Sequence, residues 1–493
     1  MTITPEIKKA EILNAVSINL KNAVECKLNI AEEEVSSVIF VSAKANLNSA
    51  TCLNGEIRYG GKVLFYLILS SGGIKKCEAG VEFSYRQEVK DVKEGEIFIG
   101  DITAENVKIT VVNGIPTASA MLVLSGRVIK KEYSDYIKDA PEIHVKKRQA
   151  ENLALVASEC KEFDLEEEFD VDFPINEVAW HSETATVNSV SSGIGAVSVE
   201  GFVETNFLFC LGDGKLESLK RNILFNFEKE IKFAMPDLIA TCKVDVADCN
   251  VKIVVDRAKG KSSVAVLLKL SVRTCVYENE PLSFVADAYL ETHHLSLEKT
   301  PVKIDKILGE KIFEKKVNCP AVSKFDKSTL LVCPIFAKIE EIEVATGNEN
   351  AKVIGVARVG ALLSLDGNYF VETALCPFEI DCGEPLTKAF INRAQIFNVE
   401  YSLVGDSLNV DFAVSVAIER FETSVCDFAL KVELNAPREK SNSAISVFIP
   451  TPGDTLWDVA KSLGVKEEEI LKTNGDLVFP LVGDERIVIY KEL

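Results

Sequence analysis

Internal repetition is the feature of this sequence that most restricts its fold. The tetrapeptide Asn-Val-Lys-Ile occupies 106–109 and returns unchanged at 250–253, and a looser copy, Asn-Val-Glu-Tyr, follows at 398–401. The two intervals are nearly equal, and each is long enough for a whole domain, whereas solenoid repeats are only a few tens of residues long. The chain is therefore expected to contain three homologous domains in tandem.

The residues around each tetrapeptide predict β-hairpins, because a turn follows each copy and an alternating apolar run follows each turn. The turns lie at 113–114, 259–261 and 405–406, and the runs at 118–129, 263–276 and 408–421. A second block recurs upstream of each hairpin. Strands at 55–59, 199–203 and 355–359 lead into apolar runs at 64–67, 207–209 and 362–365. Glycine turns at 72–73, 212–214 and 366–368 follow these runs, and phenylalanine-bearing strands at 81–83, 224–227 and 377–380 come after the turns. Glycine supplies the positive φ that tight turns require, so the turns mark the same place three times.

These patterns predict a mainly β protein with three tandem sandwich-like or barrel-like modules at 15–137, 160–280 and 308–430. The pattern alone leaves the choice between sandwich and barrel open. The stretches between modules carry more charge, and 146–151 is interpreted as a short helix or a linker. The acidic run at 166–168 is interpreted as a solvated face, because nothing arranges its carboxylates around a cation.

Composition narrows the classes of function. The length of 493 residues suggests three or four domains. The net charge of −20 argues against general nucleic-acid binding and against anionic membrane surfaces, since both depend on Lys and Arg. Residues 1–9 lack the charged and then apolar pattern of a secretory signal, which favours a cytoplasmic location.

Thirteen cysteines and four histidines limit the chemistry that the chain can support. No two cysteines form Cys-x-x-Cys, and most lie in apolar runs, which favours reduced, buried thiols over disulfides or metal sites. The segment 260–262 resembles only the end of a phosphate-binding loop, because Val255 stands where a glycine is required. No catalytic residue, metal site or cofactor is assigned, although a hydrolase built on β-modules remains a third class of function.

The period of the pattern changes after a polar linker at 435–443. A strand at 445–449, helices at 456–463 and 466–473, and a strand at 486–490 are expected in the tail. The tail, residues 444–493, is thus predicted to be a small β-α-α-β domain.

Two residues near the start of the first tail helix, Asp454 and Trp457, are expected to have specific roles. Trp457 borders the apolar stripe of this helix and is expected to be partly buried under the second helix. Asp454 is interpreted either as the N-cap of the helix or as a charge that contacts a partner.

The segment 452–460, Pro-Gly-Asp-Thr-Leu-Trp-Asp-Val-Ala, resembles the start of a LysM domain. In that family, the loop before the first helix and the loop after the second helix form a shallow groove that binds N-acetylglucosamine polymers. The resemblance implies a groove with two walls, the first made of Gly453, Asp454, Thr455 and Leu456, and the second of Asn474, Gly475 and Asp476.

The three β-modules resemble the SPOCS domain of spore-coat-associated proteins in endospore-forming bacteria. Several SPOCS domains followed by one LysM domain is the arrangement of the SipL-like spore coat morphogenetic proteins. The resemblance implies a non-enzymatic scaffold or adaptor in the mother-cell cytoplasm, at the forespore surface, that helps the coat encase the forespore. Its LysM domain would dock a SpoIVA-like spore coat ATPase, with other coat proteins as further partners. The alternative is a cell-wall protein that binds peptidoglycan or a chitin-like glycan through LysM.

Overall fold

The computed structural model describes residues 3–70, 74–212, 214–256, 260–319, 328–347, 349–404, 406–439 and 445–490. Strands account for 77% of the residues and helices for 5%, so the predicted mainly β fold is confirmed. The predicted turn at 72–73 lies outside the described residues, as do Asp213, Lys259 and Gly405 of the other turns and 440–444 of the linker.

Residues 6–139, called unit 1 below, contain two three-stranded antiparallel sheets with the strand orders β1-β6-β5 and β2-β3-β4. The strands are β1 (Glu6–Lys27), β2 (Val38–Leu53), β3 (Glu56–Ser70), β4 (Ile74–Glu88), β5 (Ile97–Val112) and β6 (Ile115–Asp139), and the short 3-10 helix η1 (Glu32–Ser37) precedes β2. The two sheets enclose one apolar core, which includes Phe65 from β3 and Leu122 from β6.

The same strand order recurs in unit 2 (residues 144–289) and unit 3 (residues 293–437), as β7-β12-β11 with β8-β9-β10, and as β13-β18-β17 with β14-β15-β16. The strands of unit 2 are β7 (His144–Val171), β8 (Ile175–Ser192), β9 (Ala196–Leu211), β10 (Leu216–Glu230), β11 (Ile239–Asp256) and β12 (Lys261–Tyr289). Those of unit 3 are β13 (His293–Cys319), β14 (Leu330–Ala345), β15 (Lys352–Leu365), β16 (Asn368–Asp381), β17 (Lys388–Val404) and β18 (Ser407–Pro437). Each of these units also has its own core between its two sheets.

The predicted hairpins are confirmed in each unit. The strand pairs that contain the repeated tetrapeptide are β5/β6, β11/β12 and β17/β18, and the second set of hairpins is β3/β4, β9/β10 and β15/β16. Asn113 (φ 52°) and Gly114 (φ 75°) connect β5 to β6. Both are left-handed, as a two-residue turn that matches the twist of its strands requires.

The stretch at 146–151 is neither a helix nor a linker, which corrects the expectation from sequence. It belongs to β7 and pairs with β12, for example Arg148 with Phe284 and Ala150 with Leu282. Residues 146–149 are all exposed, so this part of β7 lacks the alternation of apolar and polar residues by which a strand is predicted from sequence.

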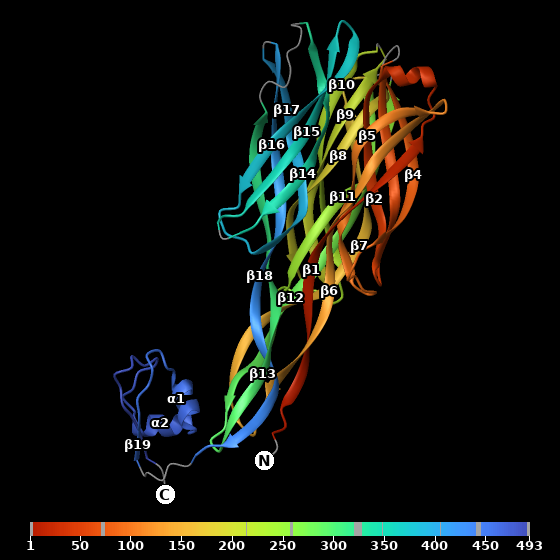
Figure 1. Cartoon of the computed structure of the whole chain (residues 1–493). Helices are drawn as coiled ribbons and strands as arrows, with labels where there is room; N and C mark the ends of the chain where they lie inside the picture. The colour runs from red at the N-terminus through yellow and green to blue at the C-terminus, as the bar shows by residue number, and fades with distance from the viewer. Residues whose placement is uncertain are drawn as a thin grey trace.

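The ends of the long strands form three two-stranded ribbons that pack against one another: β1/β6, β7/β12 and β13/β18. Figure 1 shows the sheets gathered at one wide end and these ribbons converging at the narrow end. Tyr136, Phe284 and Phe428, one from each unit, meet in a shared core there. A second shared core at the wide end contains Phe40 and Trp180 together with residues of β14 and β15. The three units therefore form one body.

A glycine faces a phenylalanine across the strands at the same place in each unit: Gly61 with Phe83, Gly201 with Phe225, and Gly355 with Phe378. A Cβ atom on Gly201 would lie 2.1 Å from the Thr186 carbonyl oxygen and 2.5 Å from the Phe225 ring. The repeated glycine thus serves close approach of a neighbouring strand and an aromatic ring rather than a turn.

Residues 445–490 form the terminal module, which contains β19 (Ile445–Phe448), α1 (Leu456–Leu463), α2 (Glu467–Thr473) and β20 (Ile487–Tyr490). The elements follow the order expected from the sequence. Helix α1 ends at Gly464, whose φ of 63° gives the left-handed conformation that glycine adopts at a C-cap. In Figure 1 the terminal module lies beside the narrow end of the body.

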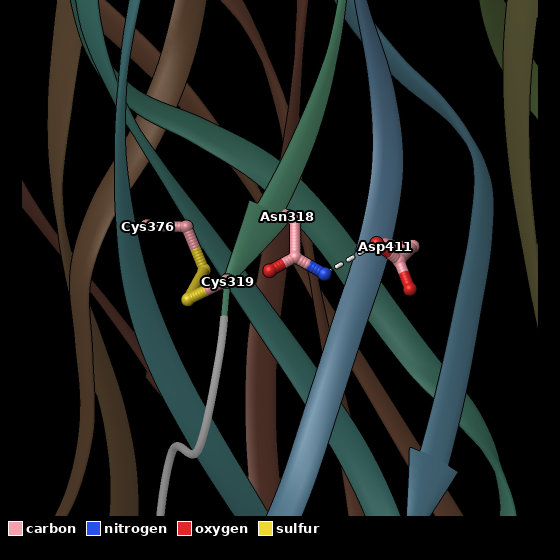
Figure 2. The surroundings of a disulfide bond; sticks show 4 residues. All are labelled: Asn318, Cys319, Cys376 and Asp411. Carbon is pink, nitrogen blue, oxygen red and sulfur yellow. Dashed lines mark hydrogen bonds between the residues drawn. A yellow bond between two sulfur atoms is a disulfide. The ribbon is translucent and has the colours of Figure 1, made fainter.

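One disulfide corrects the expectation of reduced thiols. Cys319 at the end of β13 and Cys376 on β16 are joined, with Cα atoms 5.8 Å apart (Figure 2). Because the two cysteines come from the two different sheets of unit 3, no local spacing could reveal the pair. Cys52 and Cys242 are among the buried free thiols: burial raises the pKa of Cys52 to about 11 and that of Cys242 to about 12, so both stay protonated at neutral pH.

Candidate functional site

The first wall of the expected groove is held by hydrogen bonds within the terminal module. The Gly453 amide donates to the Leu481 carbonyl (2.7 Å), and the Leu481 amide donates to the Asp454 carbonyl (2.9 Å). The Asp454 carboxylate accepts from the Thr451 amide at 2.7 Å. The first wall is therefore tied to the loop at 481, beyond the residues of the second wall.

Thr455, and not Asp454, is the N-cap of α1, which corrects one of the two interpretations of Asp454. The Thr455 hydroxyl accepts from the Asp458 amide (3.3 Å), and the Asp458 carboxylate accepts from the Thr455 amide (3.0 Å). This reciprocal pair is a capping box, and it satisfies two backbone donors that would otherwise lack partners.

Asn474 of the second wall is engaged in holding the fold. Its amide nitrogen donates to the carbonyls of Ile470 (2.9 Å) and Val488 (2.8 Å), and its amide oxygen accepts from the Val488 amide (2.9 Å). Asn474 thus ties the end of α2 to β20. Gly475 and Asp476 are exposed beside it, so they are the members of the second wall that face solvent.

Trp457 is partly buried, as expected, but it packs against the body of the protein as well as against the core of its own module. Its indole nitrogen donates to the Asp287 carboxylate of β12 at 2.8 Å. Its ring packs edge to face against the Tyr289 ring, with the two ring centroids 4.9 Å apart. Lys461, one turn later on α1, donates to the same carboxylate at 2.7 and 2.8 Å. The half-buried Trp457 therefore helps to dock the module.

The end of α1 completes this contact. The Tyr289 hydroxyl donates to the Val465 carbonyl at 2.9 Å. The Arg438 guanidinium donates to the Lys461 carbonyl (2.8 Å) at the helix end and to the Leu290 carbonyl (3.0 Å) on the body. A cation at the carboxyl end of a helix satisfies free carbonyls and complements the helix dipole.

The contact between the terminal module and the body also shifts the pKa values of Asp287 and Tyr289. Burial disfavours the charged form of Asp287, but the hydrogen bonds from Lys461 and Trp457 outweigh burial and hold the pKa of this carboxyl below its ordinary value. Burial raises the pKa of Tyr289 to about 12. Asp287 is therefore ionised and Tyr289 neutral at pH 7. Neither residue carried a sequence signal, because the contact forms across 170 residues of chain.

Within the body, polar side chains from all three units meet where the units join. Arg127 of β6 forms a buried ion pair with Glu419 of β18 and donates to the Tyr277 hydroxyl of β12 at 2.8 Å. Thr241 of β11 donates to Glu419 at 2.7 Å. Burial alone lowers the pKa of Arg127, but Glu419, Tyr277 and Cys275 together outweigh burial and raise it, so the guanidinium stays charged.

A cavity of about 640 Å³ adjoins this junction and is lined by strands of all three units. Its charged residues have mixed signs, and two of them link units: Lys243 of unit 2 forms an ion pair with Asp101 of unit 1, and Arg393 of unit 3 donates to the Cys242 carbonyl of unit 2 at 2.6 Å. The cavity lining therefore serves to join the units.

No family model, curated protein or solved structure matches this chain. In the part of the chain that the structure describes, no helix is long and apolar enough to cross a membrane.

Proposed function

We propose that the chain is a SipL-like spore coat morphogenetic scaffold and adaptor without enzymatic activity. In this proposal, units 1 to 3 are SPOCS domains, and the terminal module is a LysM domain that docks a SpoIVA-like spore coat ATPase. The place of action is the mother-cell cytoplasm at the forespore surface. The observation that carries the proposal is the recurrence of one strand order three times, followed by a strand-helix-helix-strand module.

The architecture supports a scaffold because the three units share apolar cores and are not separate domains joined by linkers. Such a body holds its surfaces in fixed relation to one another. Two residues that line the cavity at the junction, Lys243 and Arg393, form an ion pair and a hydrogen bond between units. A rigid body with one small appended module suits recruitment of a partner to a fixed position.

The sheet face of the terminal module supports docking of a protein. Ile445 and Tyr490 lie opposite each other on β19 and β20 and are 55% and 65% exposed, and Val447 beside them is 58% exposed. Apolar side chains gathered on one exposed face are typical of protein interaction sites. Since β12 covers the Trp457 side of α1, we assign partner docking to this sheet face.

Binding of the full chain to a purified SpoIVA-like ATPase tests the proposal. Val447→Lys should weaken binding about tenfold or more, because a buried charge at the centre of an interface lacks a partner. Val425→Lys is the matched control, since Val425 is a similarly exposed valine (55%) on β18. Absence of binding by the unmodified chain, or equal loss in both variants, would reject the adaptor.

Calorimetry with chitin oligomers tests the alternative of a peptidoglycan-binding cell-wall protein. A saturable heat that disappears in Asp476→Ala would favour that alternative, because Asp476 is the exposed charged residue of the second wall. The adaptor proposal expects no such heat.

A further inference from the structure

Unit 2 brings one histidine, one glutamate and one cysteine together, although no spacing in the sequence predicts a metal site. His181 and Glu183 lie on β8, and Cys249 lies on β11. Their metal-binding atoms all lie within 4.8 Å of one another. His181 Nδ1 and Glu183 Oε1 are 2.5 Å apart.

The strand geometry explains why these three side chains converge. His181 and Glu183 are two positions apart on one strand, so both project from the same face of β8. β11 belongs to the other sheet of unit 2, and Cys249 follows the register shift between Val246 and Asp248. No local motif marks the group, because two of the residues come from one sheet and the third from the other.

We propose that His181, Glu183 and Cys249 form a zinc site. An imidazole nitrogen, a carboxylate oxygen and a thiolate sulfur are the three ligand types that Zn²⁺ takes in proteins, and three protein ligands leave a fourth tetrahedral position open. His181 and Glu183 line a cavity of about 500 Å³ together with Tyr66, Trp180 and Arg358. Water or a small anion from this cavity would complete the coordination.

Two ammonium groups beside the ligands oppose a bound cation, so both must turn away when Zn²⁺ enters. Lys44 Nζ lies 3.8 Å from Glu183 Oε2, and Lys76 Nζ lies 3.0 Å from His181 Nε2. Lys76 has a second partner, Glu78, to which it can turn when the imidazole binds a metal. As the bond between sulfur and zinc forms, the Cys249 thiol releases its proton to solvent, so the thiolate and the Glu183 carboxylate together balance the charge of Zn²⁺.

Metal titration of the full chain tests the site directly. After removal of metal with a chelator and dialysis, the chain should bind one equivalent of Zn²⁺. The same site loaded with Co²⁺ should show the absorption of a thiolate-to-cobalt charge transfer. Zinc should also raise the unfolding temperature, because a ligand that binds only the native state stabilises it.

Variants locate the site. Cys249→Ser and His181→Ala should weaken zinc binding by more than the 10- to 100-fold typical for loss of an outer partner. Cys160→Ser and His144→Ala are the controls: Cys160 is exposed, and His144 pairs with Glu291 without a cysteine. If either test variant fails to fold, protection of Cys249 from alkylation by Zn²⁺ in the unmodified chain gives the answer. No bound zinc, no charge-transfer band, or full binding by Cys249→Ser would overturn the proposal.

Discussion

At the scale of single residues, the glycines opposite phenylalanine are the most constrained positions of the three units. Gly201→Ala should destabilise the protein by about 1–3 kcal/mol, because its Cβ would overlap the Thr186 carbonyl and the Phe225 ring. Gly193→Ala is the control, since a Cβ there meets only the Ala196 oxygen at 3.6 Å. Urea unfolding compares the two, and equal stabilities would show that the strand yields without cost.

Thr455 caps α1, whereas the neighbouring Asp454 does not. Thr455→Ala should cost about 0.5–2 kcal/mol, because it removes the side-chain acceptor of the capping box. Asp454→Asn should leave stability nearly unchanged, because an amide oxygen can still accept from the Thr451 amide. Thermal unfolding followed by circular dichroism measures both, and a larger loss for Asp454→Asn would mean that its charge matters to the fold.

At the scale of elements, α1 is the link between the terminal module and β12. Trp457→Ala removes the indole hydrogen bond to Asp287 and the ring contact with Tyr289, so the module should detach from the body. Small-angle scattering should then report a larger radius of gyration, and protease should cleave more readily near the linker. Leu471→Ala, an exposed position on α2, is the control and should keep the module docked.

Docking of this element should depend on pH through Asp287. Its pKa in the docked state lies below the ordinary value, so the contribution of Asp287 is complete above the ordinary pKa of about 4. It is lost as the pH falls through the lower pKa of the docked carboxyl. Scattering between pH 7 and pH 3 should show detachment only at the acidic end. Asp287→Asn should dock more weakly at neutral pH and remove the part of the pH dependence that Asp287 supplies.

At the scale of the whole molecule, the Arg127–Glu419 pair joins units 1 and 3 in a fully buried place. Glu419→Ala should cost about 3–5 kcal/mol, because it leaves a buried guanidinium without its counter-charge. Glu433→Ala removes the exposed pair with Lys431 and should cost at most about 1 kcal/mol. Calorimetric unfolding distinguishes them. A small loss for Glu419→Ala would mean that water or another carboxylate replaces Glu419 at the junction.

The sequence alone determined the local structure. Turn glycines and alternating apolar residues are short-range signals, so the hairpins and the mainly β class could be predicted. The tail is the clearest example: Gly464 and the apolar stripe with Val459 and Ala460 define α1 within one or two turns of chain.

Only the tertiary structure decided which distant residues meet. The strand at 146–151 was missed because its charged residues face solvent, whereas its partner β12 and the neighbouring ribbons fix its conformation. The packing of different sheets or modules brings three distant pairs together: Cys319 with Cys376, Trp457 with Asp287, and His181 with Cys249. Such contacts depend on which sheets and modules bury their apolar surfaces against each other. The local pattern of residues along the chain does not predict which surfaces pair.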